Sequence, residues 1–452
     1  MVYDVIVVGS GFSAIAVTCN LIQRLPAKAT IAIVGDDPGF GRGTAYRTEL
    51  YLHRLNVPAG RMSLFPDRPE SFVEWLNSRG SPLSEGDFAS RNDYGLYLRD
   101  TLAALLRKRD DRCRVDFVKA KATGCVERYG ASLGFLLGNG DEIAGKNVVL
   151  CLGVGNAGLP VDPVGEPAPG RSRIVRNPWR LSWLRRVAAT DKVVILGSGL
   201  TMIDQVLALR TFGHRGSIDV LSRRGLAPLG HARTVITPIK IDVHTLPKTI
   251  SAILNVLREK ADRSEDWRAV MDGLRPVTQE LWKRLSHDER SRFLRHALPW
   301  WSIHRHRVAP DVFDKFDGLI RDDVVRFHAG FLKSIELRGV AGVVARYRAR
   351  GTRKIAEIGA DWLINCTGME RAGIGHSPLL KEMMRLNLIA TDPLGLGIQV
   401  DAHSSVVTPI GKAPGRVFAV GALTAGQYWE ITAVPDIRVQ ARAVAEGIAR
   451  SM

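Results

Sequence analysis

Two glycine-rich turns in this 452-residue chain have the residue types and spacing that bind the pyrophosphate of a dinucleotide. In the first, VIVVGSGFSA, Gly9, Gly11 and Ala14 follow a β-branched run and precede helix-like spacing. Gly9 permits a tight turn, Gly11 lets a pyrophosphate approach the backbone, and Ala14 lets helix and strand pack closely. The phosphates would lie at the helix N-terminus. A turn this close to the start of the chain is typical of FAD-binding proteins; the alternative is a glycine turn that binds nothing.

A carboxylate about 20 residues beyond such a turn, at the end of the second strand, normally binds the ribose hydroxyls. The segment ATIAIVGDDPGFGRG has Gly35 where a glutamate is expected, followed by Asp36 and Asp37. Asp36 is therefore the candidate ribose ligand.

The second turn, VVILGSGLTMIDQVLAL, has Gly197, Gly199 and Met202 in the same order. Its second strand, SIDVLSRRG, ends without a carboxylate and supplies Ser222, Arg223 and Arg224. A hydroxyl and guanidinium groups suit a 2′-phosphate, which an acidic residue would repel. We therefore expect NADPH rather than NADH here; the alternative is that these arginines are solvated at a strand end. Two such units predict that one holds a flavin nucleotide and the other delivers a nicotinamide to it.

Charge, apolar stretches and cysteine spacing limit which partners and which cellular location we expect. Lys and Arg outnumber Asp and Glu by 63 to 46, which gives a net charge of +17 and favours anionic partners. The basic residues are scattered, without a long run of like charge, so we expect no nucleic acid. No stretch reaches the length of a membrane span, and no signal-peptide pattern opens the chain, so we expect a cytoplasmic protein. The five cysteines, none in a CxxC, indicate buried thiols in a reducing compartment. They are Cys19, Cys113, Cys125, Cys151 and Cys366.

Further motifs resemble a bacterial family of FAD/NAD(P)-binding proteins with two dinucleotide folds. They are GFGRGTAY, HRLNVPAGRMSLFPDRPESFVEWL, RNDYGLYL, VLSRRGLAP, WWSIHRHRVAP and GQYWEITAVPDIRVQ. The resemblance runs through nearly the whole chain and implies FAD and NADPH as cofactors, but it hardly restricts the substrate. Within these motifs, the first turn and the strand RVFAVGALT, we expect additional cofactor contacts from Ser13, Arg42, Gly43, Asn56, Met62, Gly421, Ile431 and Thr432.

A fainter similarity connects the chain with N-hydroxylating flavin monooxygenases. In those enzymes a segment after the first βαβ unit lines the flavin, and an Arg-x-x-aromatic-x-x-Tyr-Leu stretch follows it. Here RMSLFPD and RNDYGLYL have a similar order, with Arg91, Tyr94, Tyr97 and Leu98.

The pattern predicts an α/β fold of two Rossmann-like dinucleotide-binding domains, one inserted into the other. KNVVLCLGVGN and ADWLINCTGME resemble the paired crossover strands of such flavoproteins, and PVDPVGEPAPG indicates a linker. The FAD domain would comprise residues 1–165 and 370–452, and the NADPH domain residues 166–369. Residues 245–298 show helical patterning, so we expect a helical insertion there.

Two concentrated stretches carry the candidate catalytic residues. HRHR places His304 and His306 beside two arginines, as a cationic wall for an anionic substrate or the NADPH phosphates, or as structural partners of carboxylates in the neighbouring domain. Acidic or cysteine ligands at helpful spacing are missing, so we expect no metal. In GQYWEITAVPDIR, Trp429 and Glu430 would lie by the flavin ring, at the N-terminus of a helix starting near residues 431–434. The alternative for Trp429 is packing at a domain junction.

Three functions remain open from the sequence. The first is an NADPH-dependent FAD monooxygenase that passes one oxygen of O2, through a flavin hydroperoxide, to a nitrogen or sulfur of a small molecule. The second is a reductase or oxidase that passes electrons to a partner protein, a quinone or O2. The third is a flavin-binding redox sensor or scaffold. The sequence is compatible with an oligomer.

Overall fold

The computed structural model describes residues 2–36, 40–108, 113–127, 132–153, 155, 157–165, 173–339, 342–368, 374–375, 377–413 and 415–452. Several features named above touch residues outside these ranges: Asp37, the first residue of GFGRGTAY, the ends of KNVVLCLGVGN and ADWLINCTGME, the second half of the predicted linker, and both predicted domain boundaries.

The first sheet combines residues 2–150 with one strand near the C-terminus. Its strands run in the order β3-β2-β1-β6-β5-β4, and β15 pairs with β6. β1, β2, β3, β6 and β15 are parallel, whereas β4 and β5 form an antiparallel hairpin that pairs with the first half of β6. The bounds are β1 Val2–Val8, β2 Thr30–Val34, β3 Arg114–Val118, β4 Ala122–Glu127, β5 Leu133–Leu137, β6 Glu142–Leu150 and β15 Val417–Ala419.

Helices cover both faces of this sheet. α1 (Phe12–Arg24) is apolar on nearly all sides because it lies between the sheet and α13 (Val434–Ser451), which closes the chain. α12 (Pro378–Arg385) covers the other face beside β4. The remaining helices of this domain are α2 Gly43–Tyr46, the 3₁₀ turn η1 Ala59–Arg61, α3 Ser71–Ser78 and α4 Arg91–Arg107.

The second sheet has the order β13-β12-β11-β10-β9-β14-β8, with β7 paired to β11. Strands β8, β14, β9, β10 and β11 are parallel, and β12 and β13 extend the sheet antiparallel. The bounds are β7 Pro163–Val164, β8 Ile174–Val175, β9 Val193–Leu196, β10 Ile218–Ser222, β11 Val325–Leu337, β12 Val343–Ala349, β13 Ile355–Ala360 and β14 Trp362–Asn365. The 3₁₀ segment η2 (Leu181–Arg186) and α5 (Leu200–Thr211) belong to the same domain.

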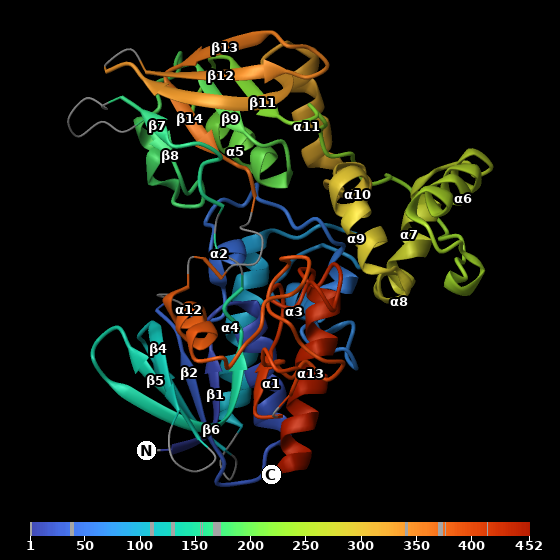
Figure 1. Ribbon diagram of the computed structural model, residues 1–452. Helices are drawn as coiled ribbons and strands as arrows, with labels where there is room; N and C mark the ends of the chain where they lie inside the picture. Colours follow the sequence, from blue (N-terminus) through green and yellow to red (C-terminus); the bar gives the residue numbers. More distant parts are fainter. Residues whose placement is uncertain are drawn as a thin grey trace.

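Between β10 and β11 the chain forms helices and no strand, and this span is fully described. Its elements are η3 Val243–Thr245, α6 Ile250–Asp262, α7 Arg268–Leu274, η4 Arg275–Val277, α8 Thr278–Arg284, α9 His287–Arg292, the π-helical turn η5 Phe293–Ala297, α10 Leu298–Arg305 and α11 Pro310–Arg321. The core of this helical insertion includes Leu396 and Trp429 of the first domain. The insertion therefore bridges both domains, as the position of α8 and α9 in Figure 1 shows.

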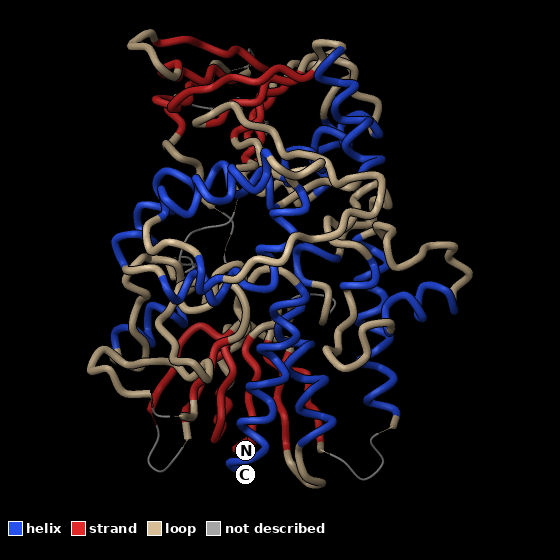
Figure 2. Tube along the Cα trace, turned by 90° about the vertical axis from the view of Figure 1, so that its right-hand side faces the viewer, coloured by secondary structure: helices blue, strands red, loops and turns tan. Residues whose placement is uncertain are grey.

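The two sheets lie at opposite ends of the molecule, with α2 and the loops of the first domain between them (Figure 1). Both termini lie at the far end of the first domain (Figure 2). Because β1 starts at that end, the carboxyl ends of the parallel strands of the first sheet point toward the second domain. Ligands of open α/β sheets bind at such carboxyl ends.

Candidate functional site

The first glycine turn is built by contacts that exclude a side chain at Gly9. Gly9 has φ +131° and donates its N–H to Val34 O at 2.8 Å. A Cβ on Gly9 would lie 2.3 Å from the carbonyl oxygen of Cys151, which itself donates its N–H to Val8 O. The turn thus fits tightly between β1, β2 and β6, and Gly11 caps the start of α1.

Other residues of the first domain cover this turn. Gly43, at φ +57°, starts α2 so close to the turn that its Cβ would lie 3.1 Å from Gly11 Cα. A Cβ on Gly421, just after β15, would lie 2.4 Å from Ser13 Oγ. The structure therefore brings together four expected cofactor positions from distant parts of the chain, and Arg42 immediately precedes Gly43. Ala14 is fully buried between helix and sheet.

The missing glutamate at the end of β2 has a steric cause. A Cβ on Gly35 would lie 2.6 Å from both Cβ and Oγ of Ser10, so this position excludes a side chain. Asp36, the candidate ribose ligand, follows directly and is exposed.

The second turn repeats the geometry of the first. Gly197 has φ +94° and donates its N–H to Leu221 O at 2.9 Å. Its Cβ would lie 2.2 Å from the carbonyl oxygen of Cys366, which in turn donates its N–H to Leu196 O. Met202 is fully buried, whereas a Cβ on Gly199 would meet nothing within 4 Å. The second turn is therefore equally tight in its backbone but open to solvent above.

The expected phosphate ligands lie at the end of β10. Ser222 Oγ accepts the N–H of Gly225 at 3.0 Å, and Arg224 donates to His296 O at 3.3 Å. Arg350, which the sequence motifs did not indicate, donates to Arg223 O at 3.4 Å. It follows β12 in RYRARGTRK, a stretch whose concentration of cations was the available signal.

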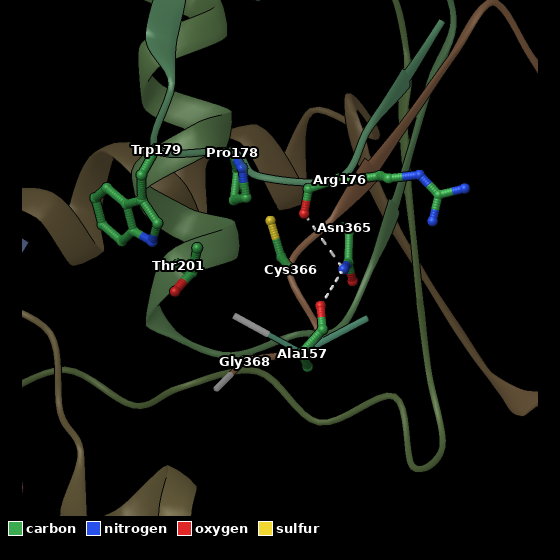
Figure 3. Close-up of a pocket in the computed structure, with 8 residues that line it drawn as sticks. All are labelled: Ala157, Arg176, Pro178, Trp179, Thr201, Asn365, Cys366 and Gly368. Atoms are coloured by element: carbon green, nitrogen blue, oxygen red, sulfur yellow. Dashed lines mark hydrogen bonds between the residues drawn. The ribbon is translucent and has the colours of Figure 1, made fainter. Parts of the chain in front are cut away.

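A pocket opens beside the second turn at the carboxyl end of β14 (Figure 3). Asn365 closes one side by donating to the carbonyl oxygens of Ala157 and Arg176, at 2.8 and 3.5 Å. Thr201 from the start of α5 faces it from another side. The lining residues are Ala157, Arg176, Pro178, Trp179, Thr201, Asn365, Cys366 and Gly368. Thr201, Asn365, Cys366 and Gly368 lie within the quoted segments VVILGSGLTMIDQVLAL and ADWLINCTGME, but the motifs gave them no role in a pocket. Ala157, Arg176, Pro178 and Trp179 lie outside every quoted motif.

A buried ion pair joins the two domains next to this pocket. Arg91, at the start of α4, contacts Asp204 of α5 at 3.1 Å, and their side chains are 14% and 9% exposed. His53 Nε2 lies 3.2 Å from Asp204 O, and burial lowers the pKa of this histidine. Arg91 and Asp204 line a second, smaller pocket together with Asn56 and Leu200. Asn56, an expected flavin contact, therefore lies near the start of α5 in the second domain. Met62 is buried nearby in the same loop region.

The HRHR motif is mostly paired with carboxylates. Glu430 Oε1 accepts the indole N–H of Trp301 at 2.9 Å and lies 3.4 Å from His306 Nε2, and its Oε2 lies 3.5 Å from Arg305 Nε. Burial alone would raise the pKa of Glu430, but these partners lower it to about 2. His304 is half-buried instead: its Nδ1 lies 2.8 Å from Trp300 O, and its ring packs edge-to-face on Trp267 at 4.7 Å between centroids. These contacts correspond to the structural alternative for the motif.

Trp429 packs at the junction between the first domain and the helical insertion. It stacks on Trp282 of α8 at 4.5 Å between ring centroids, and Trp282 donates its indole N–H to Gly426 O. Ile431 is buried and Thr432 is exposed. They precede α13, which starts at Val434, within the range of residues 431–434 expected from the sequence.

The five cysteines are buried, and no disulfide joins them. Burial raises the pKa of Cys151 and Cys366, which disfavours thiolate chemistry. Within the described ranges, no three side chains of His, Cys, Asp or Glu gather at a spacing that suits a metal ion. No helix in those ranges is both long and apolar enough to cross a membrane.

Part of the chain matches a known family of cofactor-binding domains. Residues 6–155 match a family model described as FAD-NAD(P)-binding. No curated protein sequence matches the chain.

Solved structures match over the whole chain. An ornithine N-hydroxylase from Kutzneria sp. 744 is 14% identical, with a TM-score of 0.66 and 100% of each chain covered. An L-lysine 6-monooxygenase from Pseudomonas syringae is 17% identical with a TM-score of 0.65, again over 100% of each chain. A bacillithiol disulfide reductase from Bacillus cereus is 13% identical with a TM-score of 0.57 over the same coverage.

At these identities the likeness establishes the fold. The expected α/β architecture of two Rossmann-like dinucleotide-binding domains is thereby confirmed, and the resemblance to FAD/NAD(P)-binding proteins is matched by the family model over residues 6–155. The fold likenesses include N-hydroxylating monooxygenases, the group to which the sequence showed a fainter similarity.

Proposed function

We propose that this chain is an FAD-dependent oxidoreductase that uses NADPH, and that it is a monooxygenase acting on a nitrogen or sulfur of a small molecule. The observation that carries the proposal is the duplicated turn. Gly9 and Gly197 each lie against the carbonyl oxygen of a cysteine that follows a crossover strand, so closely that an added Cβ would come within 2.3 and 2.2 Å of that oxygen. Two such cradles on one chain suit two dinucleotides.

The first cradle fits FAD. Its backbone excludes side chains, the N-terminus of α1 faces the place where phosphates would bind, and the family description of residues 6–155 supports the assignment. The residues proposed to hold FAD are Gly9, Gly11, Ser13, Ala14, Asp36, Arg42, Gly43, Asn56, Met62, Gly421, Ile431 and Thr432. When bound, flavin supplies hydride acceptance and reaction with O2, which side chains cannot perform.

The second cradle fits NADPH. The space above Gly199 is open, and Ser222, Arg223 and Arg224 stand at the end of β10, with Arg350 beside them. Guanidinium groups bind a phosphate monoester by charge-assisted hydrogen bonds, so these residues would hold the 2′-phosphate. The pocket lined by Trp179 and Asn365 adjoins this turn and would take the nicotinamide side of the cofactor.

The helical insertion would keep water from the reacting atoms. Trp282, Trp301 and Trp429 pack it against the first domain next to the start of α13. In the first turn of α13, burial raises the pKa of Asp436 to about 6, so its carboxyl changes protonation near neutral pH. A carboxyl at this end of α13 is placed to exchange a proton with a neighbouring group.

The choice of nitrogen or sulfur as the oxygenated atom is supported by the fold likeness to an ornithine N-hydroxylase and a lysine 6-monooxygenase. A reductase or oxidase is the second candidate, since a bacillithiol disulfide reductase shares the fold. The buried cysteines with raised pKa, none in a CxxC, argue against a thiol mechanism.

Stopped-flow spectroscopy distinguishes these functions. For a monooxygenase we expect NADPH to bleach the bound flavin, and O2 to reoxidise it through a distinct absorbing species that NADP+ prolongs. Direct reoxidation, with peroxide matching all NADPH consumed, would favour the oxidase. Failure of NADPH to bleach the flavin would favour a sensor or scaffold.

Two further assignments belong to this proposal. The NADPH domain would comprise residues 166–369 and the two parts of the FAD domain residues 1–165 and 370–452, in agreement with β15 pairing in the first sheet. The strand pair β7–β11 places residues 163–164 beside the second sheet, so the crossing lies close to this boundary. The five unlinked thiols suit a cytoplasmic location.

A further inference from the structure

Charged side chains gather where the helical insertion meets the start of α13. We call this group the arginine cluster; its members are Asp272, Arg275, Arg305, His306, Arg307, Glu430, Asp436 and Arg438. It has contributions from α7, η4, α10 and the segment after it, and from the first turns of α13. Arg305 and Arg307 are only 7% and 3% exposed, which is unusual for guanidinium groups.

Most cations of the cluster have a protein partner. Arg305 lies 3.5 Å from Glu430 and Arg307 pairs with Asp272. Arg438 donates to Ser63 O at 2.9 Å, so it is tied to the loop that contains Met62. These contacts position the cluster between the helical insertion and the loop expected to line the flavin.

Several buried polar atoms of the cluster nevertheless make no hydrogen bond. Twelve buried side-chain nitrogen or oxygen atoms in the described ranges lack a hydrogen bond, and five of them lie here. They are the Nε atoms of Arg275, Arg305, Arg307 and Arg438 and Oε2 of Glu430. Arg305 Nε and Glu430 Oε2 face each other as an ion pair at 3.5 Å, so Nε of Arg275, Arg307 and Arg438 are the atoms that a ligand or water would have to satisfy. Buried polar groups in native proteins are almost always satisfied, so this concentration indicates a polar ligand or bound water.

Arg275 is the cation of the cluster whose charge is least balanced by neighbouring groups. Among the described residues, no carboxylate forms an ion pair with it and no acceptor takes a hydrogen bond from it. Burial, followed by the charges of Arg305 and Arg61, lowers its pKa to about 9. A partly buried guanidinium among other cations is costly, and an anion would relieve that cost.

The position of the cluster connects it with the proposed flavin site. Asp436 belongs to the first turn of α13, the helix expected to point at the flavin ring. His231 Nε2 lies 3.0 Å from Asn56 O, and burial together with the charge of Arg307 lowers the pKa of this histidine to about 4. The cluster therefore adjoins two of the proposed flavin contacts, Asn56 and Met62, from the side of the insertion.

We propose that the arginine cluster is the substrate-recognition site and binds an oxyanion of the small molecule, a carboxylate or a phosphate, with Arg275 as its principal ligand. Glu430 and Asp272 hold Arg305 and Arg307 in place, and Arg275 keeps its donors for the ligand. This proposal rests on the proposed function, since it names the substrate class of the same site. It also explains why Arg305, His306 and Arg307 of HRHR are paired with carboxylates: they hold the anion site in shape. The donor left for the anion is Arg275 of η4.

Isothermal titration calorimetry with sodium malonate and with inorganic phosphate tests the proposal, with NADP+ present in excess to occupy the second turn. We expect the wild-type protein to bind one of these probes, and the preferred probe separates a carboxylate site from a phosphate site. Arg275→Met should weaken that binding by at least about tenfold, and Arg275→Lys by less, because lysine keeps the charge but loses the bidentate geometry. Arg284→Met, which removes an exposed arginine of the same insertion, should leave it unchanged.

Absence of binding to the wild type, or equal binding by Arg275→Met, would overturn the proposal. These readings need no flavin reduction, so failure of the proposed function would appear separately, as loss of bleaching with anion binding intact.

Thermal unfolding provides a second, independent reading. Because Arg275 forms no ion pair or side-chain hydrogen bond with the described residues, Arg275→Met should melt at the same temperature as the wild type or higher. A lower melting temperature, or failure to fold, would show that Arg275 has a structural role and would contradict the assignment.

Discussion

The two glycine turns have the same backbone and different surroundings. The residue that caps the following helix has φ −90° and ψ −167° at Gly11, and φ −86° and ψ −171° at Gly199. Above Gly11 lies Gly43, whose Cβ would come within 3.1 Å, and nothing lies within 4 Å of a Cβ on Gly199.

This difference indicates how each site treats its nucleotide. The first turn is enclosed by α2 and by Gly421 after β15, which suits a cofactor that stays bound through many turnovers. The second is open, which suits a cofactor that enters and leaves in each cycle. The carbonyl oxygens of Cys151 and Cys366 make both turns tight in the same way, so the two turns share their backbone geometry. They differ in the residues that cover them: Gly43 and Gly421 enclose the first turn, and the space above Gly199 is open.

The largest effects are expected at the first glycine of each turn. Gly9→Ala should abolish flavin binding and impair folding, because its Cβ would overlap Cys151 O and alanine is strained at φ +131°. Gly197→Ala has the same clash with Cys366 O, but we expect it to retain flavin and to lose at least about a hundredfold in the rate of reduction by NADPH.

Flavin content after gel filtration and anaerobic reduction kinetics measure the two losses. Gly359→Ala, in β13 with open space around it, is the control and should behave like the wild type. If Gly197→Ala lost flavin as completely as Gly9→Ala, the two sites would not be functionally distinct.

Gly43→Ala and Gly199→Ala test the difference between the enclosed space above the first turn and the open space above the second. Gly43→Ala should weaken flavin retention and lower the melting temperature, since it is strained at φ +57° and presses on Gly11. Gly199→Ala should leave the melting temperature within about 1 °C and raise KM for NADPH by about tenfold, because its Cβ enters space needed by the pyrophosphate. An unchanged KM in Gly199→Ala would mean that the open space is not the nucleotide site.

A smaller effect is expected at the end of β10, where the second unit has arginines and the first has Asp36. Arg223→Ala and Arg224→Ala should each raise KM for NADPH about tenfold or more, leave NADH use nearly unchanged and leave flavin in place, with a smaller effect at high salt. Arg350→Ala should act in the same direction more weakly, through Arg223.

Steady-state kinetics with both nucleotides measure these changes, and exposed Arg353→Ala is the matched control. Equal use of NADH and NADPH by the wild type would refute the assignment of these arginines to a 2′-phosphate.

The smallest effect concerns the first turn of α13, which contains Asp436. Burial raises the pKa of Asp436 to about 6, so between its unfolded value of 3.8 and about 6 the folded state binds the extra proton. That contribution to stability is lost as the pH rises through 6. Asp436→Asn should therefore raise the melting temperature at pH 8 by about 2 °C and change it little below pH 3.8, where the carboxyl is protonated in both states. Exposed Asp322→Asn is the control in the same calorimetric scans.

The sequence predicted those parts of the molecule that depend on local spacing. Gly9 and Gly197 were identified because a tight turn between a strand and a helix needs glycine there. The cover of the first turn, by contrast, needs Gly43 and Gly421 to meet Gly11 and Ser13 from distant positions, and only resemblance indicated them.

Other features of the site could not be predicted from the sequence. Arg275 lies on a helical stretch whose sequence shows no motif, and Asp204 lies in the helix after the second turn at a position to which the motif assigns no role. Their importance comes from neighbours that folding brings close. The histidines of HRHR showed the reverse: in this conspicuous motif, His306 is paired with Glu430 and His304 packs on Trp267.

Anaerobic addition of one equivalent of NADPH to the purified flavoprotein tests the division of roles between the two turns. We predict that flavin stays with the protein through dialysis, that NADPH removes its long-wavelength absorption, and that the resulting NADP+ can be dialysed away. A flavin that is lost with the nicotinamide, or one that NADPH leaves oxidised, would contradict the division between an enclosed first site and an open second one.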